Sequence, residues 1–314
     1  MIDLTLVMVV KNDADALKLT LEQLTRVKHI EKAELIVVDG SDDNLCQEVM
    51  CDYRHIITIN IIEPDTGIYN AFNKALGRSS KKYFMWHNAG DLLHPSFLEK
   101  LQISGKQNTI HICETIKFSR GKVMHRLTYN PTPDLHQNVG FSNSSAIFPK
   151  TSWMKHGGYD ESYKIAGDSN FILKLIKDNY EVKIFDSTVY MNMHGVSNTN
   201  LVRSRHEYIR AYNSVFYSEL RLGRFEERKL RIREYFNRHP KSVNIKLLYK
   251  NIRQSIKKIT INSAVNFMNI VSNRALKVFT LRHFFKFEID KGVIIGKIGK
   301  IYDIGNVIIG ENTI

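Results

Sequence analysis

The sequence predicts an α/β fold built on a mixed, mainly parallel sheet with helices on both faces. Two observations lead to this prediction. Over roughly the first 190 residues, short runs rich in Val, Ile and aromatic residues alternate with segments whose apolar residues recur at helical spacing. Apolar strands separated by helices are typical of a parallel sheet that is covered on both faces. With 314 residues, 43% of them hydrophobic, the chain can bury one sizeable core.

The predicted elements alternate along the chain as such a fold requires. Strands are expected at residues 4–10, 34–39, 56–62, 82–87, 109–118, 122–127, 144–148 and 182–185. Helices are expected at residues 14–27, 67–76, 96–103 and 167–178, and one long basic helix at residues 208–240. The first helix carries Leu17, Leu21 and Leu24 on one face. In a sheet of this kind, ligands bind beyond the carboxyl ends of the strands.

Charge is unevenly distributed along the chain. The formal net charge is +13, and residues 201–287 hold 20 Lys and Arg against 5 Asp and Glu. The remainder is therefore close to neutral. Charge and hydrophobic pattern together predict an α/β domain over residues 1–200, a basic and largely helical region over residues 201–287, and a short β segment over residues 288–314.

Residues 241–287 combine apolar and basic side chains at helical spacing. In "NIKLLYKNIRQSIKKI", isoleucine and leucine fall on one face, with lysine and arginine around it. This pattern is typical of a helix that lies on an anionic membrane surface. The alternative is a helical subdomain that packs its apolar side on the α/β core and leaves its lysines in water.

The final residues repeat Ile-Gly pairs, and "VIIGENTI" resembles one coil of a hexapeptide β-helix. About three stacked repeats are needed to stabilise such a solenoid, and fewer are present here. Either the chain is cut from a longer protein, or this segment packs on a partner, which leaves a homo-oligomer open.

Composition and the N-terminal sequence indicate the compartment. No stretch reaches the roughly 18 uncharged apolar residues that span a bilayer. The N-terminus "MIDLTLVMVVKND" lacks the basic leader and the cleavage site of a signal peptide. The three cysteines, Cys46, Cys51 and Cys113, have no metal-binding or redox spacing. These features predict a reducing, cytoplasmic location.

Two predicted strands end in carboxylates next to glycine. "ELIVVDGSDD" ends its apolar run at Asp39, and "YFMWHNAGD" runs into Asn88 and Asp91. Both stretches therefore place acidic side chains at the edge of the sheet where ligands bind, with Gly40 and Gly90 permitting tight turns. The alternative is that these Asp and Asn residues only form turns.

Four motifs occur in a fixed order: "VVDGSDD", "EPDTGIYNAFNKALGRSSKKYFMWHNAGD", "HQNVGFSNSSAIFPKTSWMKHGGYDESYKIAGDSNFILKL" and "HGVSN". In this order, over residues 3–200, the chain resembles family-2 inverting glycosyltransferases of the GT-A type. The resemblance is closest to bacterial enzymes that build capsule, O-antigen or exopolysaccharide. It implies a GT-A, Rossmann-like domain and a transferase of the hexosyltransferase type. It also implies a nucleotide-sugar donor, with uracil as the base by family habit, and a glycan or lipid-linked acceptor.

The resemblance also implies a divalent metal, Mn²⁺ or Mg²⁺, bound by a short acidic motif after a central strand. Asn88-Ala-Gly-Asp91 stands at that place. Asp91 is the expected metal ligand, and Asn88 is expected to contact the sugar or the diphosphate. The motif departs from the family pattern, because it holds one carboxylate instead of two. His194 stands where related enzymes supply a further metal or diphosphate contact, although a lone histidine is more often structural.

The catalytic base implied by the resemblance is Asp168, in "YKIAGDSNFILKL". A carboxylate at the start of a helix is stabilised by the backbone dipole. Helix capping is the alternative role for this residue. The surrounding "GYDESYKIAGD" matches the acceptor-side segment of the family, which supplies the catalytic carboxylate.

The remaining site residues are also implied by the resemblance. Those expected to bind the nucleotide are Val10, Lys11, Asn12, Asp39, Gly40 and Ser41. Those expected beneath the donor are Asp65, Gly67, Asn73 and Lys74, although Lys74 can instead be a solvated surface residue. His136 and Gln137 are expected to line the acceptor or donor-sugar pocket, and Trp153 is expected in the core.

Two other classes of protein fit parts of the pattern. A sugar-nucleotide pyrophosphorylase would carry a G-x-G-x-R loop after the first strand, where this chain has "VVKNDADA". A non-catalytic binder of nucleotide sugars or nucleic acid is the second alternative. The basic segment lacks a zinc-finger, RNA-recognition or basic-zipper pattern, so no nucleic-acid partner is expected.

If residues 241–287 bind a membrane surface, the protein is expected to be peripheral on the inner face of the bacterial cell membrane. It would then act on a lipid-linked acceptor.

Overall fold

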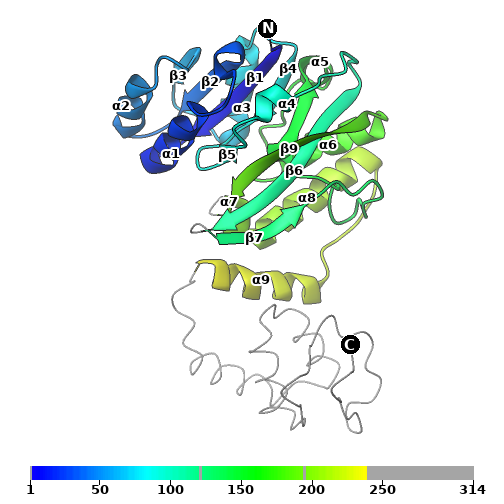
Figure 1. Ribbon diagram of the computed structural model, residues 1–314. Helices are drawn as coiled ribbons and strands as arrows, with labels where there is room; N and C mark the ends of the chain where they lie inside the picture. Colours follow the sequence, from blue (N-terminus) through cyan, green and yellow to red (C-terminus); the bar gives the residue numbers. More distant parts are fainter. Residues whose placement is uncertain (1, 120–121, 194–195, 239–314) are drawn as a thin grey trace, which may run out of the picture. The chain divides into compact units, whose positions relative to one another are not determined.

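The described residues of the computed structural model, 2–119, 122–193 and 196–238, contain one mixed sheet of nine strands (Figure 1). Its order is β3-β2-β1-β4-β8-β6-β9-β5, and β7 pairs with β6. The strands are β1 (Leu4–Val10), β2 (Glu34–Asp39), β3 (Ile59–Ile62), β4 (Tyr83–Trp86), β5 (Leu92–Leu93), β6 (Thr109–Ser119), β7 (Lys122–Leu127), β8 (Ala146–Pro149) and β9 (Glu181–Asn192). This arrangement confirms the predicted α/β class.

Strand direction determines which residues meet at the ligand-binding edge. Strands β3, β2, β1 and β4 are parallel, with Val10 opposite Asp39 in the register of β1 and β2. Strand β8 is antiparallel to both β4 and β6, so β6 and its parallel neighbour β9 run in the same direction as β4. The carboxyl ends of β1, β2, β4, β6 and β9 therefore lie along one edge.

Helices cover both faces of the sheet, as predicted. The helices on one face are α3 (Ile68–Arg78), α6 (Gly167–Lys177) and α8 (Leu201–Phe216), which share one hydrophobic cluster with β1, β2 and β4. The helices on the other face are α1 (Ala14–Leu24), α2 (Leu45–Asp52) and α4 (Phe97–Lys100). The shorter elements are η1 (Ile30–Lys32), η2 (Asn143–Ser145), α5 (Lys150–Lys155) and α7 (Val196–Thr199).

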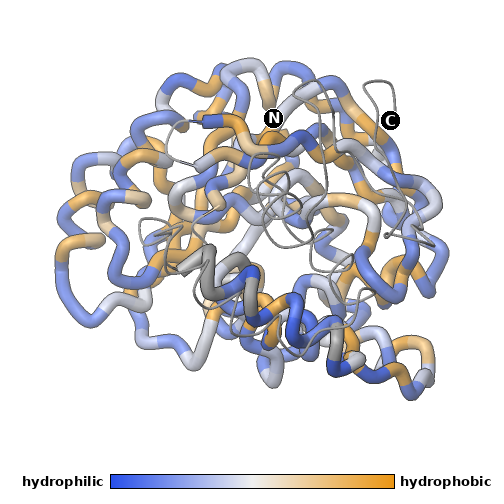
Figure 2. Tube along the Cα trace, turned by 90° about the horizontal axis from the view of Figure 1, so that it is seen from below, coloured by the Kyte–Doolittle hydropathy of each residue, from blue (hydrophilic) through white to orange (hydrophobic). Residues whose placement is uncertain are grey.

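Alternating side chains of the central strands divide the core into two clusters. Val7, Ile36 and Val38 point into the cluster beneath α3 and α6. Leu6 and Val37 point into the opposite cluster, beneath α1 and α2. This alternation is the period-two geometry of a strand. Strands β1 and β2 are buried along almost their whole length, as a sheet covered on both faces requires. Figure 2 shows hydrophobic and hydrophilic segments following one another along the trace.

Several predicted boundaries differ from the structure. The strand expected at residues 182–185 extends to Asn192, because β9 pairs with β6 over most of its length. The helix expected at 96–103 is only Phe97–Lys100, and the strand expected from 56 begins at Ile59. The long helix expected at 208–240 is interrupted. Helix α8 ends at Tyr217 in a left-handed conformation with φ of 54°, and a second helix, α9 (Arg224–Arg238), follows.

The chain divides into two compact units, residues 1–222 and 223–314. The predicted boundary at residue 200 falls within the first unit, between α7 and α8. In the second unit, α9 holds six Arg and Lys against three Glu, and the regions predicted at 241–287 and 288–314 lie outside the described residues. Within the ranges that the structure describes, no helix has the length and apolar character needed to cross a membrane.

Candidate functional site

The first part of the site is formed by the turns that follow β1, β2 and β4, which we call the strand-end region (Val10–Asn12, Asp39–Ser41 and Asn88–Asp91). Asp39 is 2% exposed, and its Oδ1 accepts a hydrogen bond from the backbone N–H of Ser41 at 2.9 Å. Its Oδ2 is buried and has no hydrogen-bond partner among the described residues. Since a buried carboxylate oxygen needs a donor, this atom is suited to a ligand hydroxyl or N–H.

The turns after β1 and β2 hold each other in place. Gly40 donates its backbone N–H to the carbonyl of Val10 at 3.1 Å. Asn12 has a φ of 54° and donates its N–H to Ser41 Oγ at 2.8 Å. Its side chain also exchanges two hydrogen bonds with Asp42, each of 2.9 Å. Five of the predicted nucleotide-binding residues, from Val10 to Ser41, are thus brought together, and Lys11 is exposed beside them.

Asp65 and Gly67 approach this region from the segment before α3. A Cβ atom on Gly40 would overlap the Oδ2 atom of Asp65, so glycine is required for the two segments to meet. Gly67 has a φ of 146° and forms the N-cap of α3. The structure therefore places Asp65 against the end of β2, and its expected position beneath the donor stays a prediction.

The Asn88–Asp91 turn is held by residues that are far from it in the sequence, Thr20 of α1 and Asn192 of β9. Gly90, with a φ of 92°, donates its N–H to Thr20 Oγ1 at 2.8 Å, and the Thr20 hydroxyl donates to the carbonyl of Asp91 at 3.0 Å. Asp91 is 4% exposed, and its Oδ1 accepts the backbone N–H of Asn192 at 2.8 Å. Asn88 contributes a buried side-chain oxygen that has no partner within the described ranges.

Burial raises the pKa of Asp91 to about 7, although hydrogen bonds from Asn192 and Ser144 act in the opposite direction. A buried carboxylate is costly unless a cation or further donors compensate its charge. Its hard oxygen atoms, together with the unpartnered oxygen of Asn88, fit a divalent ion such as Mg²⁺ or Mn²⁺. His194, the other predicted metal ligand, lies outside the described residues. In the described ranges, no group of three or more His, Cys, Asp or Glu gathers as a metal site.

The second part of the site is the segment Tyr159–Asp168, which we call the helix-start region. Asp168 lies in the first turn of α6 and is partly exposed. Its Oδ1 accepts hydrogen bonds from the backbone of Ser169 at 2.7 Å and from the Tyr69 hydroxyl at 3.3 Å. Burial raises the pKa of Asp168 to about 6, and these hydrogen bonds limit the rise. The side chain is thus a carboxylate at neutral pH, and it is basic enough to accept a proton.

An aromatic cluster connects the end of β4 to Asp168. Trp86, the last residue of β4, packs with its ring centroid 5.8 Å from that of Tyr69 and 4.7 Å from that of Tyr159. The indole N–H of Trp86 donates to the Tyr159 hydroxyl at 2.8 Å. Tyr69 in turn reaches Asp168, and the absence of a side chain at Gly167 makes room for its ring. The two parts of the site are therefore linked through continuous packing.

Asn73 and Lys74 make their hydrogen bonds within the protein. The Asn73 amide donates to Tyr159 O and Glu161 Oε1, both at 2.9 Å, and its oxygen accepts from Trp153 and from the Tyr159 backbone. Lys74 donates to the carbonyl of Pro64 at 2.7 Å. These contacts brace α3 against the helix-start region, and Trp153 packs against the core as predicted.

His136 and Gln137 are exposed and lie in a turn fixed by Asp134, whose carboxylate accepts the His136 backbone N–H and the Gln137 amide. Arg205 of α8 donates to the His136 carbonyl at 2.8 Å. The His136 ring packs edge-on against Tyr212, with centroids 4.9 Å apart. Helix α8 therefore supports the loop that was predicted to line the sugar or acceptor pocket.

Sequence reasoning did not identify three residues that shape the site. Thr20 supports Asp91. Its helical spacing relative to Leu17, Leu21 and Leu24 could have predicted that its side chain faces the sheet. Asn192 binds Asp91 through its backbone, for which no side-chain signal exists. Glu207 contacts the helix-start region, and it is the only acidic residue between positions 201 and 218.

Solved structures of similar fold include two of low sequence identity, of which the first is the more similar in structure. The mannosyltransferase PcManGT from Pyrobaculum calidifontis, solved with GDP-Man and Mn²⁺, is 13% identical and aligns over 90% of this chain and 82% of its own, with a TM-score of 0.54. S. aureus TarS 1–349, solved with UDP-GlcNAc, is 14% identical over 89% of this chain and 85% of its own, with a TM-score of 0.48. No curated protein sequence is detectably similar.

The fold is that of GT-A glycosyltransferases. Residues 5–149 match the model described as glycosyl transferase family 2. Residues 5–149 therefore form a family-2 glycosyltransferase domain, as the sequence motifs predicted.

Proposed function

We propose that this enzyme transfers a sugar from a UDP-linked donor to a hydroxyl group of a glycan or lipid-linked acceptor, with inversion, during bacterial surface polysaccharide synthesis. The observation that best supports the proposal is the environment of Asp168. Burial raises the pKa of this carboxyl group to about 6, and aromatic packing links it to the end of β4. A single-displacement reaction needs one such base and a separate site for the leaving diphosphate.

In the proposed reaction, the Asp168 carboxylate removes the proton from the acceptor hydroxyl. The acceptor oxygen forms a bond to the anomeric carbon while the bond from that carbon to the diphosphate oxygen breaks. The electron pair of the broken bond leaves with the nucleoside diphosphate. Attack from the face opposite the leaving group inverts the anomeric carbon.

The strand-end region is suited to hold the nucleotide diphosphate. Asp39 Oδ2, which is buried without a partner in the described chain, would accept a hydrogen bond from the base or ribose. Asp91 and His194 would bind the divalent ion, and Asn88 would contact the sugar or diphosphate. When bound, such an ion stabilises the negative charge that develops on the leaving diphosphate. We leave Asn73 and Lys74 out of the donor contacts, because their polar groups already bind the protein.

A panel of UDP-, GDP- and dTDP-sugars tests the proposal, with release of nucleoside diphosphate as the measurement and with Mn²⁺, Mg²⁺ or EDTA present. A UDP-sugar should give the fastest release, and EDTA should reduce it. Pyrophosphate exchange instead of diphosphate release would overturn the transferase assignment, and faster turnover of a GDP-sugar would correct the base.

We also propose that residues 241–287 hold the enzyme at the anionic inner surface of the cell membrane, where a lipid-linked acceptor would lie. The support is the sequence pattern of apolar residues bordered by Lys246, Lys250, Lys257 and Lys258. Replacing these four lysines with glutamine should weaken binding to vesicles that contain phosphatidylglycerol, and high salt should mimic the effect. Unchanged binding, or equal binding to neutral vesicles, would exclude this role.

A further inference from the structure

The backbone that leads into Asp168 is bound by an acidic residue from α8, outside the part of the chain that matches the family model. We infer that Glu207 is a positioning residue for the transfer reaction, because it fixes the segment 164–166 and through it the surroundings of Asp168. This inference rests on the proposed role of Asp168 as the base.

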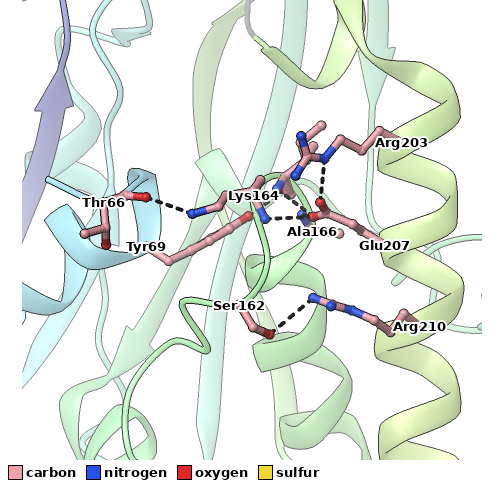
Figure 3. A network of polar contacts seen from close by, with 9 residues as sticks. Thr66, Tyr69, Ser162, Lys164, Ala166, Arg203, Glu207 and Arg210 are labelled. Atoms are coloured by element: carbon pink, nitrogen blue, oxygen red, sulfur yellow. Dashed lines mark hydrogen bonds and ion pairs between the residues drawn. The ribbon is translucent and has the colours of Figure 1, made fainter.

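Three consecutive backbone N–H groups converge on one oxygen of Glu207. Oε2 accepts from Lys164 at 2.9 Å, from Ile165 at 2.7 Å and from Ala166 at 3.1 Å (Figure 3). Successive N–H groups that point to one centre form an anion-binding nest, and here the anion is a side chain of the same protein. Burial acts to raise the pKa of Glu207, but these bonds and the one from Arg203 outweigh it and lower the pKa below 4.5.

Other side chains of α8 hold Glu207 and the same segment in place. Arg203 donates from Nε to Glu207 Oε1 at 2.9 Å, one helical turn away. Arg210 lies over the Tyr163 ring at 3.8 Å and donates to Ser162 Oγ at 3.3 Å. Helix α8 also packs on α6, since Tyr208 and Ala211 belong to the same core cluster as Phe171. The helix is therefore a rigid support for the helix-start region.

The fixed segment reaches Asp168 through Tyr69. The Tyr69 hydroxyl lies 2.5 Å from the Ile165 carbonyl and 3.3 Å from Asp168 Oδ1, so its single proton is donated mainly to Ile165. Lys164 also donates from Nζ to the carbonyl of Thr66 at 2.8 Å, which ties the segment to the start of α3. If Glu207 released the segment, Ile165 would move away from Tyr69, and the proton would become available to Asp168.

The expected consequence is a change in the basicity of Asp168. The titratable groups that the described chain places against it are Tyr69 from α3 and Tyr159 from the helix-start region. A stronger hydrogen bond from Tyr69, and greater access of water, would each favour the ionised carboxylate and lower its pKa. A weaker base in a displaced position removes the proton more slowly. A purely structural Glu207 would change the amount of folded enzyme but not this pKa.

The test compares the full-length Glu207→Gln and Glu207→Asp variants with wild type and with Glu22→Gln. Glu22 is a matched control, because it also forms an i,i+4 ion pair, with Arg26 just beyond the end of α1, but it is exposed and, within the described ranges, accepts no hydrogen bonds from consecutive backbone N–H groups. The measurements are folded fraction by circular dichroism and the pH dependence of UDP release from UDP-glucose, UDP-galactose and UDP-N-acetylglucosamine with Mn²⁺. Glu207→Gln should lower kcat about tenfold with little change in donor KM. The acid limb of the pH–rate profile of Glu207→Gln should move to lower pH. Glu207→Asp should recover part of the lost rate, and Glu22→Gln should have the same kcat and pH profile as wild type.

The result that would overturn the inference is a normal kcat, or a loss that follows the folded fraction with an unshifted acid limb. If Glu207→Gln does not fold, Glu207→Asp decides, because its shorter carboxylate should shift the acid limb in the same direction by a smaller amount. Asp168→Asn, measured in parallel, separates the two claims. An inactive Asp168→Asn with a normal Glu207→Gln removes only the role of Glu207, whereas an active Asp168→Asn removes the base assignment and this inference with it.

Discussion

Asp91 lies in a turn that follows strand β4, whereas Asp168 lies in the first turn of helix α6. Burial raises the pKa of both carboxyl groups, to about 7 and about 6. The bonds that hold the two residues differ. Asp91 is supported by the end of β9 through the Asn192 backbone N–H, and by α1 through the Thr20 hydroxyl. Asp168 is supported by Tyr69 of α3 and indirectly by α8.

This difference separates two tasks. The strand-end region leaves unpartnered oxygen atoms in the described chain, at Asp39 and Asn88, and so is suited to bind a ligand or ion. In the helix-start region, burial raises the pKa of Asp168, and its hydrogen bonds limit that rise and fix its position, so this region is suited to proton transfer. Substitutions in the first region should therefore change donor or metal binding, and substitutions in the second should change kcat and its pH dependence.

The largest effect should come from Asp168→Asn. The amide cannot accept the acceptor proton, so kcat should fall by about 1,000-fold. Donor affinity, measured by calorimetric titration with UDP, should remain within twofold of wild type, because the strand-end region is unchanged. Near-normal turnover by this variant would show that another group is the base.

Asp91→Asn should have the next largest effect. The amide retains an oxygen for the Asn192 N–H but loses the charge that attracts a cation, so kcat/KM should fall by about 100-fold at a fixed Mn²⁺ concentration. Higher Mn²⁺ should restore part of the rate. In wild type, the Mn²⁺ requirement should rise as the pH falls through 7, since a proton then competes for Asp91. A variant with unchanged Mn²⁺ dependence would exclude Asp91 as a ligand.

Asp39→Asn should act on donor binding alone. The substitution replaces one carboxylate oxygen with an N–H₂ group where the described chain offers no partner, so the hydrogen bond to the ligand would be lost. The donor KM should rise about tenfold, and kcat should change less than twofold. A fall in kcat at saturating donor would place Asp39 in the chemical step instead.

Tyr69→Phe should have the smallest effect, and it should depend on pH. Removing the hydroxyl removes a hydrogen bond that lowers the pKa of Asp168, so this pKa should rise above about 6. Because the base must be ionised, turnover should fall about threefold at pH 6 and less than twofold at pH 8. The shift is opposite in sign to that expected for Glu207→Gln. An acid limb that moves to lower pH, or does not move, would show that Tyr69 does not tune the base.

Much of the strand-end region could be predicted from the sequence. Apolar runs that stop at Asp39 and before Asn88 mark strand ends, and parallel strands bring such ends to one edge. The roles of Asn73 and Lys74 could not be predicted in the same way. Helical spacing indicates on which face of α3 they lie, but it does not indicate which segment of the chain packs against that face. Asn73 meets Tyr159 and Glu161, which lie more than 80 residues away in sequence. The break in the long basic helix was also not evident, because Tyr217 adopts a conformation that glycine usually provides.

The sequence by itself determined the α/β class, the longer strands and helices in their chain order, and the carboxylates at the strand ends, because these follow from local hydrophobic periodicity. The short elements α2, α5, α7 and β5 were not predicted. Only the tertiary structure decided how Asp91 and Asp168 are held. The extension of β9 to Asn192, the place of Tyr69 beside Asp168 and the contact of Glu207 with residues 164–166 all join segments that are far apart in sequence. Such contacts depend on how layers of the fold pack, and no local pattern encodes them.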